Sequence, residues 1–338
     1  MVWLKFVASL VIILFAGTKL ARYGDALAEK TRLGQIWIGL VLLAFITSVP
    51  ELSTGIGAVT LVSDKSLAPD LAIGTIMGSC IFNILIIAWL DMIHRREPVL
   101  TTASPNHMKS VLMGIILIGL AALSIFGGDR ISGLALGWLG VPSIVVIIVY
   151  LIGVRWTLRS ARVTQATSPQ VSHEQYRDMG MREVWIKFIL ASGAVIGSGI
   201  WLALIGEEIA NATGLGASFV GSLFLAVSTS MPEIALTTAA VRIGAVDMAV
   251  ADVTGANMIN IAKIFIIDIF YTDGSILASV SKSQITTALV AIGMSLVVLV
   301  GLRFCQRRKT FRVISWYGVV LIALYIYGAY ALYNSGLG

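Results

Sequence analysis

Apolar stretches of roughly 20 residues recur from one end of the chain to the other, separated by short polar segments. An α-helix needs about that length to cross the hydrocarbon core of a bilayer. We place ten spans, at about 2–20, 34–62, 69–92, 110–127, 131–153, 184–205, 216–242, 246–271, 284–303 and 312–333. The pattern therefore predicts an all-α polytopic membrane protein with ten transmembrane helices.

The first half of the sequence recurs in the second half. A shift of 182 positions aligns residues 17–59 with 199–241 without a gap, and the glycines stay in register. Each half holds five spans, an odd number, so the second half is expected to enter the membrane in the opposite orientation. Two inverted five-helix repeats are typical of secondary transporters, whose substrate site lies near the bilayer midplane. The predicted domains are residues 1–153, a polar linker at 154–183, and residues 184–338.

The repeat carries a duplicated string, Thr-Ser-x-Pro-Glu, at 47–51 and at 229–233. A carboxylate inside a membrane costs about 2.5–3.5 kcal/mol even on lenient insertion scales, so a duplicated one indicates function. The proline before each glutamate lacks an N–H and removes one helix hydrogen bond. We expect each break to free carbonyl oxygens about one turn earlier, near 44–46 and 226–228.

A second polar helix follows the string in each half. Thr75, Ser79 and Asn83 lie at intervals of four residues and share one helix face, as do Asp252, Ala256 and Asn260. Together with the strings, these stripes predict an oxygen-lined site formed by Glu51, Glu233, Asn83, Asn260, Thr47, Ser48, Thr229 and Ser230. Such a site suits hard cations such as Ca²⁺, Na⁺ and Mg²⁺. Taken singly, the hydroxyls could instead bond to their own helix, and the amides could join neighbouring helices.

Composition and charge agree with a membrane location. The chain is 57% hydrophobic and only 12% charged, against about 25% charged residues in a soluble protein. If the amino terminus lies on one side, the loops on that side hold only Lys5, Lys65, Arg130 and Lys282, while the other side holds most Lys and Arg. By the positive-inside rule, both termini are extracytoplasmic, and the linker 154–183 is cytoplasmic, in a plasma (inner) membrane.

The same distribution explains the net charge of +6 without a nucleic-acid partner. The sequence holds no His-Glu-x-x-His or Gly-x-Ser-x-Gly string, which argues against an enzyme, and no nucleotide-binding loop. We expect no cofactor besides bound transported Ca²⁺ and Na⁺. The expected partners are small cations and the lipid bilayer, with the chain a monomer or weak oligomer.

The duplicated string and Gly-Ser-Cys-Ile-Phe-Asn at 78–83 resemble the two alpha repeats of the sodium/calcium exchanger family, bacterial or archaeal type, within the cation/calcium exchanger superfamily. The resemblance covers essentially the whole chain, with motifs at 44–83 and 226–263. It implies a ten-helix transporter that exchanges cytosolic Ca²⁺ for external Na⁺ by alternating access, with spans 1 and 6 sliding past the rest. It further implies ligand roles for Ala44, Thr47, Ser48, Glu51, Ser79, Asn83, Ala226, Thr229, Ser230, Glu233 and Asn260.

The second repeat departs from the family pattern. Ala256 stands where the family typically has a serine, and Asn260 stands where microbial relatives often have an aspartate, although Asp252 could restore the lost charge. Lys263 is a basic residue within a span and must find a carboxylate partner there or lose its proton. Its partner could be Asp252 or Asp268 in a purely structural pair. Alternatively, its ammonium group stands in for one transported cation, which would change the ion count or couple transport to protons.

These observations favour a secondary antiporter that exchanges Ca²⁺ or a similar divalent cation for Na⁺. Two alternatives remain at this point. The carboxylates could carry protons, which would make the protein an H⁺-coupled antiporter for Ca²⁺, Mg²⁺ or Mn²⁺. A passive cation channel is the other alternative, although an inverted repeat around one midplane site favours alternating access.

Overall fold

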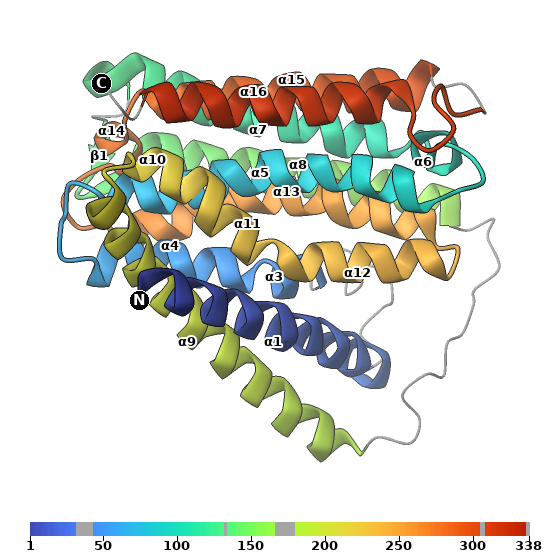
Figure 1. The fold of residues 1–338 in the computed structure, drawn as a ribbon, viewed down its shortest axis with the longest axis horizontal. Coiled ribbons are helices and arrows are strands. Elements are labelled where there is room, and N and C mark those ends of the chain that lie inside the picture. Colours follow the sequence, from blue (N-terminus) through green and yellow to red (C-terminus); the bar gives the residue numbers. More distant parts are fainter. Residues whose placement is uncertain (32–42, 132–133, 166–179, 305–307, 336–338) are drawn as a thin grey trace.

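The computed structural model describes residues 1–31, 43–131, 134–165, 180–304 and 308–335, and almost all of its regular structure is helical (Figure 1). The longer helices are α1 (Val2–Thr31), α4 (Val49–Leu61), α5 (Ala68–Ile93), α7 (His107–Gly127), α8 (Val141–Gln165), α9 (Met181–Thr213), α12 (Met231–Arg242), α13 (Val246–Phe270), α15 (Ser283–Phe304) and α16 (Trp316–Ser335). The shorter helical segments are α3 (Leu43–Thr47), α6 (Val99–Thr102), η2 (Gly128–Arg130), α10 (Ala217–Phe219), the π-helical η3 (Val220–Leu225), α11 (Ala226–Thr229) and α14 (Ile276–Ser279).

Seven helices in the described ranges are long and apolar enough to cross a membrane. The continuous stretch 217–229 and α12 give an eighth span, bent by 43° where the two join, and α8 contributes a shorter apolar helix at 141–157. Helices α5 and α13 are the most buried of these and pack against each other, so they form the centre of the bundle. The span expected at 34–62 lies partly outside the described residues, which resume at Leu43, and its described part consists of α3 and α4.

Two boundaries differ from the sequence-based expectation. The fifth span begins at Val141 rather than near 131, because a short hairpin, β1 (Ala135–Leu136) and β2 (Leu139–Gly140), precedes it with Gly137 at φ +69° in the turn. Most residues of this hairpin are apolar, and hydropathy does not distinguish a strand from a helix, so it merged the hairpin with the helix that follows. Helix α8 then continues to Gln165, into the predicted linker, and residues 166–179 of that linker lie outside the described part.

The order of elements in the first half recurs in the second. The run α3, α4, α5, α6 and α7 is matched by α11, α12, α13, α14 and α15. The matched central helices meet at equivalent positions, because Asn257 Nδ2 of α13 donates to the Cys80 carbonyl of α5 (3.1 Å) and Cys80 Sγ contacts the Asn257 carbonyl (3.8 Å). This reciprocal contact marks where the two halves meet.

Each central helix ends in a fully buried aspartate that binds both halves together. Asp91 accepts hydrogen bonds from Val99 N (3.0 Å), eight residues later, and from Ser315 N (2.7 Å), just before α16. Asp268 accepts from Ile276 N (2.7 Å), again eight residues later, and from Gly140 N (2.9 Å), just before α8. The last long helix of each half is therefore anchored to the central helix of the other half, and we call these two sets of bonds the crossed anchors.

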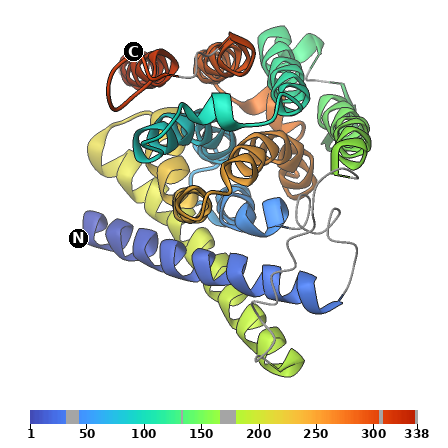
Figure 2. The same ribbon diagram turned by 90° about the vertical axis from the view of Figure 1, so that its right-hand side faces the viewer.

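Helices α1 and α9 lie side by side along one face of the bundle (Figures 1 and 2). Two matching glycines allow them to approach the helices that carry the duplicated string. A Cβ atom on Gly17 of α1 would lie 2.4 Å from Pro232 Cγ, and one on Gly199 of α9 would lie 2.2 Å from Ser53 Oγ and 3.1 Å from the Pro50 carbonyl. Each of these outer helices thus contacts the string of the opposite half.

Glycine is also required where α5 crosses the π-helical turn η3. A Cβ atom on Gly78 would lie 2.1 Å from the carbonyl oxygen of Ser222 and 2.5 Å from its Cα, and one on Gly74 would lie 3.1 Å from Ser222 N. Gly74 and Gly78 therefore allow the close approach of α5 to η3. Gly255, the counterpart of Gly78 on α13, has no heavy atom of the described residues within 4 Å of such a position.

We expect Gly78→Ala to destabilise the folded protein by about 1–3 kcal/mol, because the new methyl group meets backbone atoms that can move only together with η3. The matched control is Gly293→Ala on α15, where a Cβ atom meets nothing within 4 Å. That substitution should be neutral or stabilise by up to about 1 kcal/mol, since alanine is the better helix former. Thermal unfolding in detergent tests the pair, and equal melting temperatures for the two variants would contradict the prediction.

Candidate cation site

The duplicated strings form two helix breaks. Ser48 separates α3 from α4 with φ −88° and ψ 8°, and Ser230 separates α11 from α12 with φ −89° and ψ 10°. In each case the following helix has proline at its second position, where the missing N–H costs little. The breaks thus place Glu51 and Glu233 in the first turns of α4 and α12, where the helix dipole favours negative charge.

The side chain of Glu51 is fully buried and reaches across to the other half. Its Oε1 atom accepts a hydrogen bond from Ser230 Oγ at 3.1 Å, while Oε2 has no hydrogen-bond partner. The charges of Glu51, Asp252 and Lys263 all lie close enough to Glu233 to act on it electrostatically. The structure therefore brings the two predicted glutamates, and the predicted Asp252, into one region between the halves.

Many buried polar atoms of the two strings and the two stripes have no hydrogen-bond partner in the described part of the chain. These atoms are both carboxylate oxygens of Glu233, both side-chain polar atoms of Asn83 and of Asn260, Ser48 Oγ, Glu51 Oε2 and Asp252 Oδ2. Buried polar groups in folded proteins almost always have a partner, and each exception needs an explanation. A cation that binds between the halves would act as the partner of the oxygen atoms and would explain why they have no other.

Hydroxyl groups line the same region. Ser79 Oγ of α5 lies 3.5 Å from Thr229 Oγ1, which links the central helix of the first half to the string of the second. Thr229 also donates to the Ala226 carbonyl of its own helix at 3.1 Å, as expected for threonine in a membrane helix. Thr47 is buried as well.

In the second string, the first of the carbonyls that we expected to be free is bonded. The Ala226 carbonyl accepts hydrogen bonds from Ser230 N and from Thr229 Oγ1, both at 3.1 Å, so it is not left bare. Pro232 removes only the bond to the Ser228 carbonyl, four residues before it, whereas the Ala226 carbonyl keeps its ordinary helix bond from Ser230 N. The side chain of Ala44, its counterpart, is outside the described residues.

The partner of Lys263 is not the one expected from the sequence. Its Nζ atom donates to the Ser48 carbonyl at 3.0 Å and lies 3.6 Å from Glu51 Oε2, and the side chain is only 1% exposed. Asp268 instead belongs to the crossed anchors, and Asp252 lies on the Glu233 side. Helix periodicity considers neighbours on the same helix, whereas this partner is supplied by α4 of the other half.

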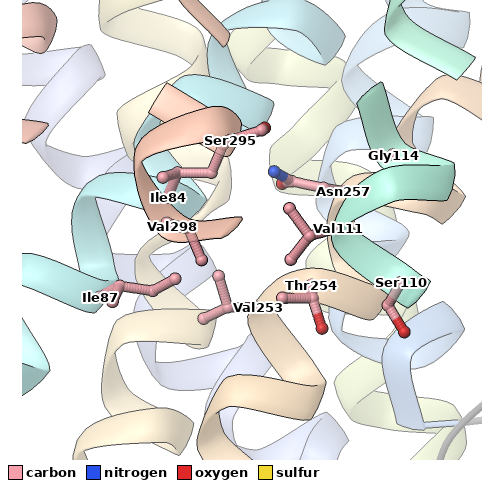
Figure 3. A pocket seen from close by; sticks show the side chains of 10 residues that line it. All are labelled: Ile84, Ile87, Ser110, Val111, Gly114, Val253, Thr254, Asn257, Ser295 and Val298. Carbon is pink, nitrogen blue, oxygen red and sulfur yellow. The ribbon is translucent and has the colours of Figure 1, made fainter. Parts of the chain in front are cut away.

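Sequence analysis also missed Asn257, which lies three residues before Asn260. Its amide nitrogen joins α13 to α5 through the Cys80 carbonyl, the joining role that we had considered for Asn83 and Asn260. Its Oδ1 atom has no partner in the described ranges, and the residue lines a small cavity of about 10 Å³ with Ser110, Thr254 and Ser295 (Figure 3). That volume is close to the lower limit for one water molecule.

The composition of the region determines which ions it suits. Within the described ranges, no three His, Cys, Asp or Glu side chains come close enough together to hold a metal ion by themselves. A bound cation would therefore take most of its ligands from hydroxyl, amide and carbonyl oxygens, with carboxylates adding charge. Ligand sets of this kind fit Na⁺ and Ca²⁺, whereas zinc and copper prefer cysteine and histidine.

Comparison with known proteins places this geometry in context. The family model described as sodium/calcium exchanger protein matches residues 1–159 and 183–334. An uncharacterised membrane protein of Methanocaldococcus jannaschii is 25% identical over 324 residues, which cover 95% of this chain and 94% of that protein.

Two solved structures share the fold. The sodium–calcium exchanger NCX_Mj, soaked with Na⁺ and Ca²⁺, matches with a TM-score of 0.60 at 21% identity, covering 96% of this chain and 95% of that one. The H⁺/Ca²⁺ exchanger CAX matches with a TM-score of 0.73 at 14% identity, covering 99% of this chain and 85% of that one. At these identities the likeness establishes the fold and leaves the coupling ion open.

Proposed function

Because the chain belongs to the sodium/calcium exchanger protein family, we propose that it is a secondary antiporter that exchanges Ca²⁺ or a similar divalent cation for Na⁺. It is a multi-pass membrane protein of a transporter family rather than an enzyme family. The proposed site lies between the two halves, where the breaks at Ser48 and Ser230 face the central helices α5 and α13.

The observation that carries this proposal is the group of buried oxygen atoms that lack partners. Glu233 offers two such carboxylate oxygens, and Asn83 and Asn260 each offer an amide oxygen. In a purely structural site these groups would be paired, because an unpaired buried charge costs several kcal/mol. A site that alternately binds and releases a cation must instead leave them available when no ion is bound.

The proposed ligands are those of the two strings and stripes. We assign Glu51, Glu233 and Asp252 to supply negative charge, and Asn83, Asn260, Thr47, Ser48, Ser79, Thr229 and Ser230 to supply neutral oxygens. Ala44 and Ala226 would contribute only backbone carbonyls, and the Ala226 carbonyl would have to exchange one of its two present hydrogen bonds for the ion.

We further propose alternating access between two inverted five-helix repeats, with both termini extracytoplasmic and the linker cytoplasmic. The recurrence of elements around the crossed anchors supports a rigid central unit. Helices α1 and α9 lie outside that unit (Figure 2). They contact it through Gly17, which faces Pro232, and Gly199, which faces the Pro50 carbonyl, and neither glycine has a side chain that would oppose sliding. Sliding of these two helices would expose the site first to one side of the membrane and then to the other.

Proton coupling is the second candidate, and two observations favour it. The fold matches the H⁺/Ca²⁺ exchanger CAX with the higher TM-score of the two solved structures described above. In addition, Glu51, Glu233 and Asp252 are carboxylates that could carry protons in exchange for a divalent cation.

Uptake of ⁴⁵Ca²⁺ into proteoliposomes separates the two coupling ions. We expect vesicles loaded with Na⁺ to accumulate ⁴⁵Ca²⁺ at least tenfold above vesicles loaded with choline, at equal pH on both sides. Excess unlabelled Mg²⁺ and Mn²⁺ in parallel samples would report the preferred divalent cation. Saturation with external Ca²⁺ would separate an exchanger from a passive channel.

A second arm imposes a pH gradient without Na⁺. Uptake driven by that gradient alone would show that H⁺, rather than Na⁺, is the coupling ion. Absence of uptake with either gradient would overturn the proposal of divalent antiport. Empty liposomes and liposomes with heat-unfolded protein are the controls for leak.

A further inference from the structure

We propose that the Lys263 ammonium group permanently occupies one of the monovalent-cation subsites, the one at Ser48 whose counterpart lies at Ser230, so that this protein moves one monovalent cation fewer per divalent cation than the same site would without it. This inference rests on the antiport proposed above and specifies its ion count. It takes up the second of the two alternatives given above for Lys263, and it starts from the groups that the ammonium contacts.

The first step concerns where the ammonium group lies. Nζ is 3.0 Å from the Ser48 carbonyl and 3.6 Å from Glu51 Oε2, and the side chain is buried. The Ser48 carbonyl belongs to the break between α3 and α4, where it accepts hydrogen bonds from Leu52 N (3.3 Å) and from Lys263 Nζ and lies on the same side as the Glu51 carboxylate. The carbonyl and the carboxylate are ligands that a monovalent metal cation would use, so the lysine competes directly for that place.

The second step concerns the equivalent place in the other half. The Ser230 carbonyl occupies the matching break, where its backbone hydrogen bond to Ile234 N (3.4 Å) mirrors that of the Ser48 carbonyl to Leu52 N (3.3 Å). The position on α5 that matches Lys263 is Ile86, which is buried and apolar. Ile86 cannot supply a charge, so the Ser230 subsite, beside the unpaired Glu233, stays available to a transported ion.

The third step is the charge of the whole site. Glu51, Glu233 and Asp252 can contribute three negative charges and Lys263 one positive charge, so the formal net charge is −2 when all four groups are ionised. That charge balances one divalent cation or two monovalent ones. Without Lys263 the net charge would be −3, which would balance three monovalent cations.

The inference therefore predicts the electrical character of exchange. The unmodified protein should exchange two Na⁺ for one Ca²⁺ and move no net charge. Lys263→Met, which keeps the length and apolar stem of lysine, should exchange three Na⁺ for one Ca²⁺ and move one charge per cycle. A potassium gradient with valinomycin sets the membrane voltage, and the ⁴⁵Ca²⁺ gradient at which net flux vanishes reports the ratio.

The expected results are a zero-flux Ca²⁺ gradient that does not change with voltage for the unmodified protein and one that changes about tenfold per 60 mV for Lys263→Met. A voltage-dependent zero-flux point in the unmodified protein would overturn the inference while leaving antiport intact. An unchanged ratio in Lys263→Met would do the same. If protons drive exchange, the same measurement applies with a pH gradient in place of Na⁺, and absence of all exchange would refute both proposals.

A double variant tests whether the ion count depends on which of the two subsites the ammonium group occupies or only on its charge. Ile86→Lys combined with Lys263→Met moves the ammonium group to the matching place in the other half. We expect this variant to regain the voltage-independent exchange of the unmodified protein. Continued movement of one charge per cycle would show that the Ser48 and Ser230 subsites are not equivalent. If Lys263→Met does not fold, the voltage test on the unmodified protein still decides the inference.

Discussion

Glu233→Gln is expected to lower divalent transport by at least about 100-fold while leaving the ion-free protein as stable as before, or more stable. Both carboxylate oxygens of Glu233 are buried without a protein partner, so the charge serves no contact within the described structure. Two unit charges 4 Å apart interact by about 4 kcal/mol at an effective dielectric constant of 20, and a divalent ion doubles that value. Glutamine keeps the shape and one oxygen but loses this attraction.

Uptake of ⁴⁵Ca²⁺ and thermal unfolding with and without Ca²⁺ test both parts of this prediction. Stabilisation by Ca²⁺ should disappear together with transport. Glu208→Gln is the matched control, because Glu208 pairs with Lys5 (2.7 Å) at a partly exposed position away from the site. A Glu233→Gln variant that melts several degrees lower without ions would indicate a structural role instead.

Glu51→Gln is expected to abolish transport and, in contrast to Glu233→Gln, to destabilise the folded protein by about 3–5 kcal/mol. The reason is Lys263, whose ammonium group would stay buried without a carboxylate within reach on its own side of the site. Removal of one member of a buried ion pair leaves an uncompensated charge, which costs far more than the pair itself contributes. The glutamine can still accept the hydrogen bond from Ser230, so the loss isolates the charge.

The double variant Glu51→Gln/Lys263→Met provides the internal control for this second prediction. It removes both charges and should recover most of the lost stability, since a buried pair replaced by neutral groups is often no less stable. Transport should not return, because a ligand of the site is still missing. Additive destabilisation of the two single changes would show that Lys263 and Glu51 do not act as a pair.

Sequence reasoning recovered the parts of the molecule that local patterns encode. Hydropathy located most spans within a few residues, and the duplicated string located both breaks and both glutamates. It failed where apolar residues are not helical, as in the hairpin before α8. It also began the range of freed carbonyls too early in the second string, because a proline removes only the bond to the carbonyl four positions before it, and the Ala226 carbonyl keeps its bond from Ser230 N.

Long-range partners were the part that the sequence could not supply. Lys263 binds to groups more than two hundred positions away, and no helix periodicity connects it with Ser48 or Glu51. Asn257 and Asn260 are indistinguishable as residue types, yet the amide of one joins two helices and the amide of the other is buried without a partner in the described structure. The difference depends on which face of α13 meets α5, and that is a property of the folded halves together.

The crossed anchors have a consequence for how such a chain can be divided. Each half ends in a helix whose start donates hydrogen bonds to an aspartate of the other half. A half expressed alone would therefore bury an aspartate that lacks one of its donors, and its last helix would begin without an acceptor for these bonds. Two identical halves could satisfy both needs by exchanging their last helices, as intertwined homodimers do. The arrangement therefore preserves, within one polypeptide, the architecture of a dimer with swapped arms. A single-half ancestor with the same contacts would have required a second copy from the beginning.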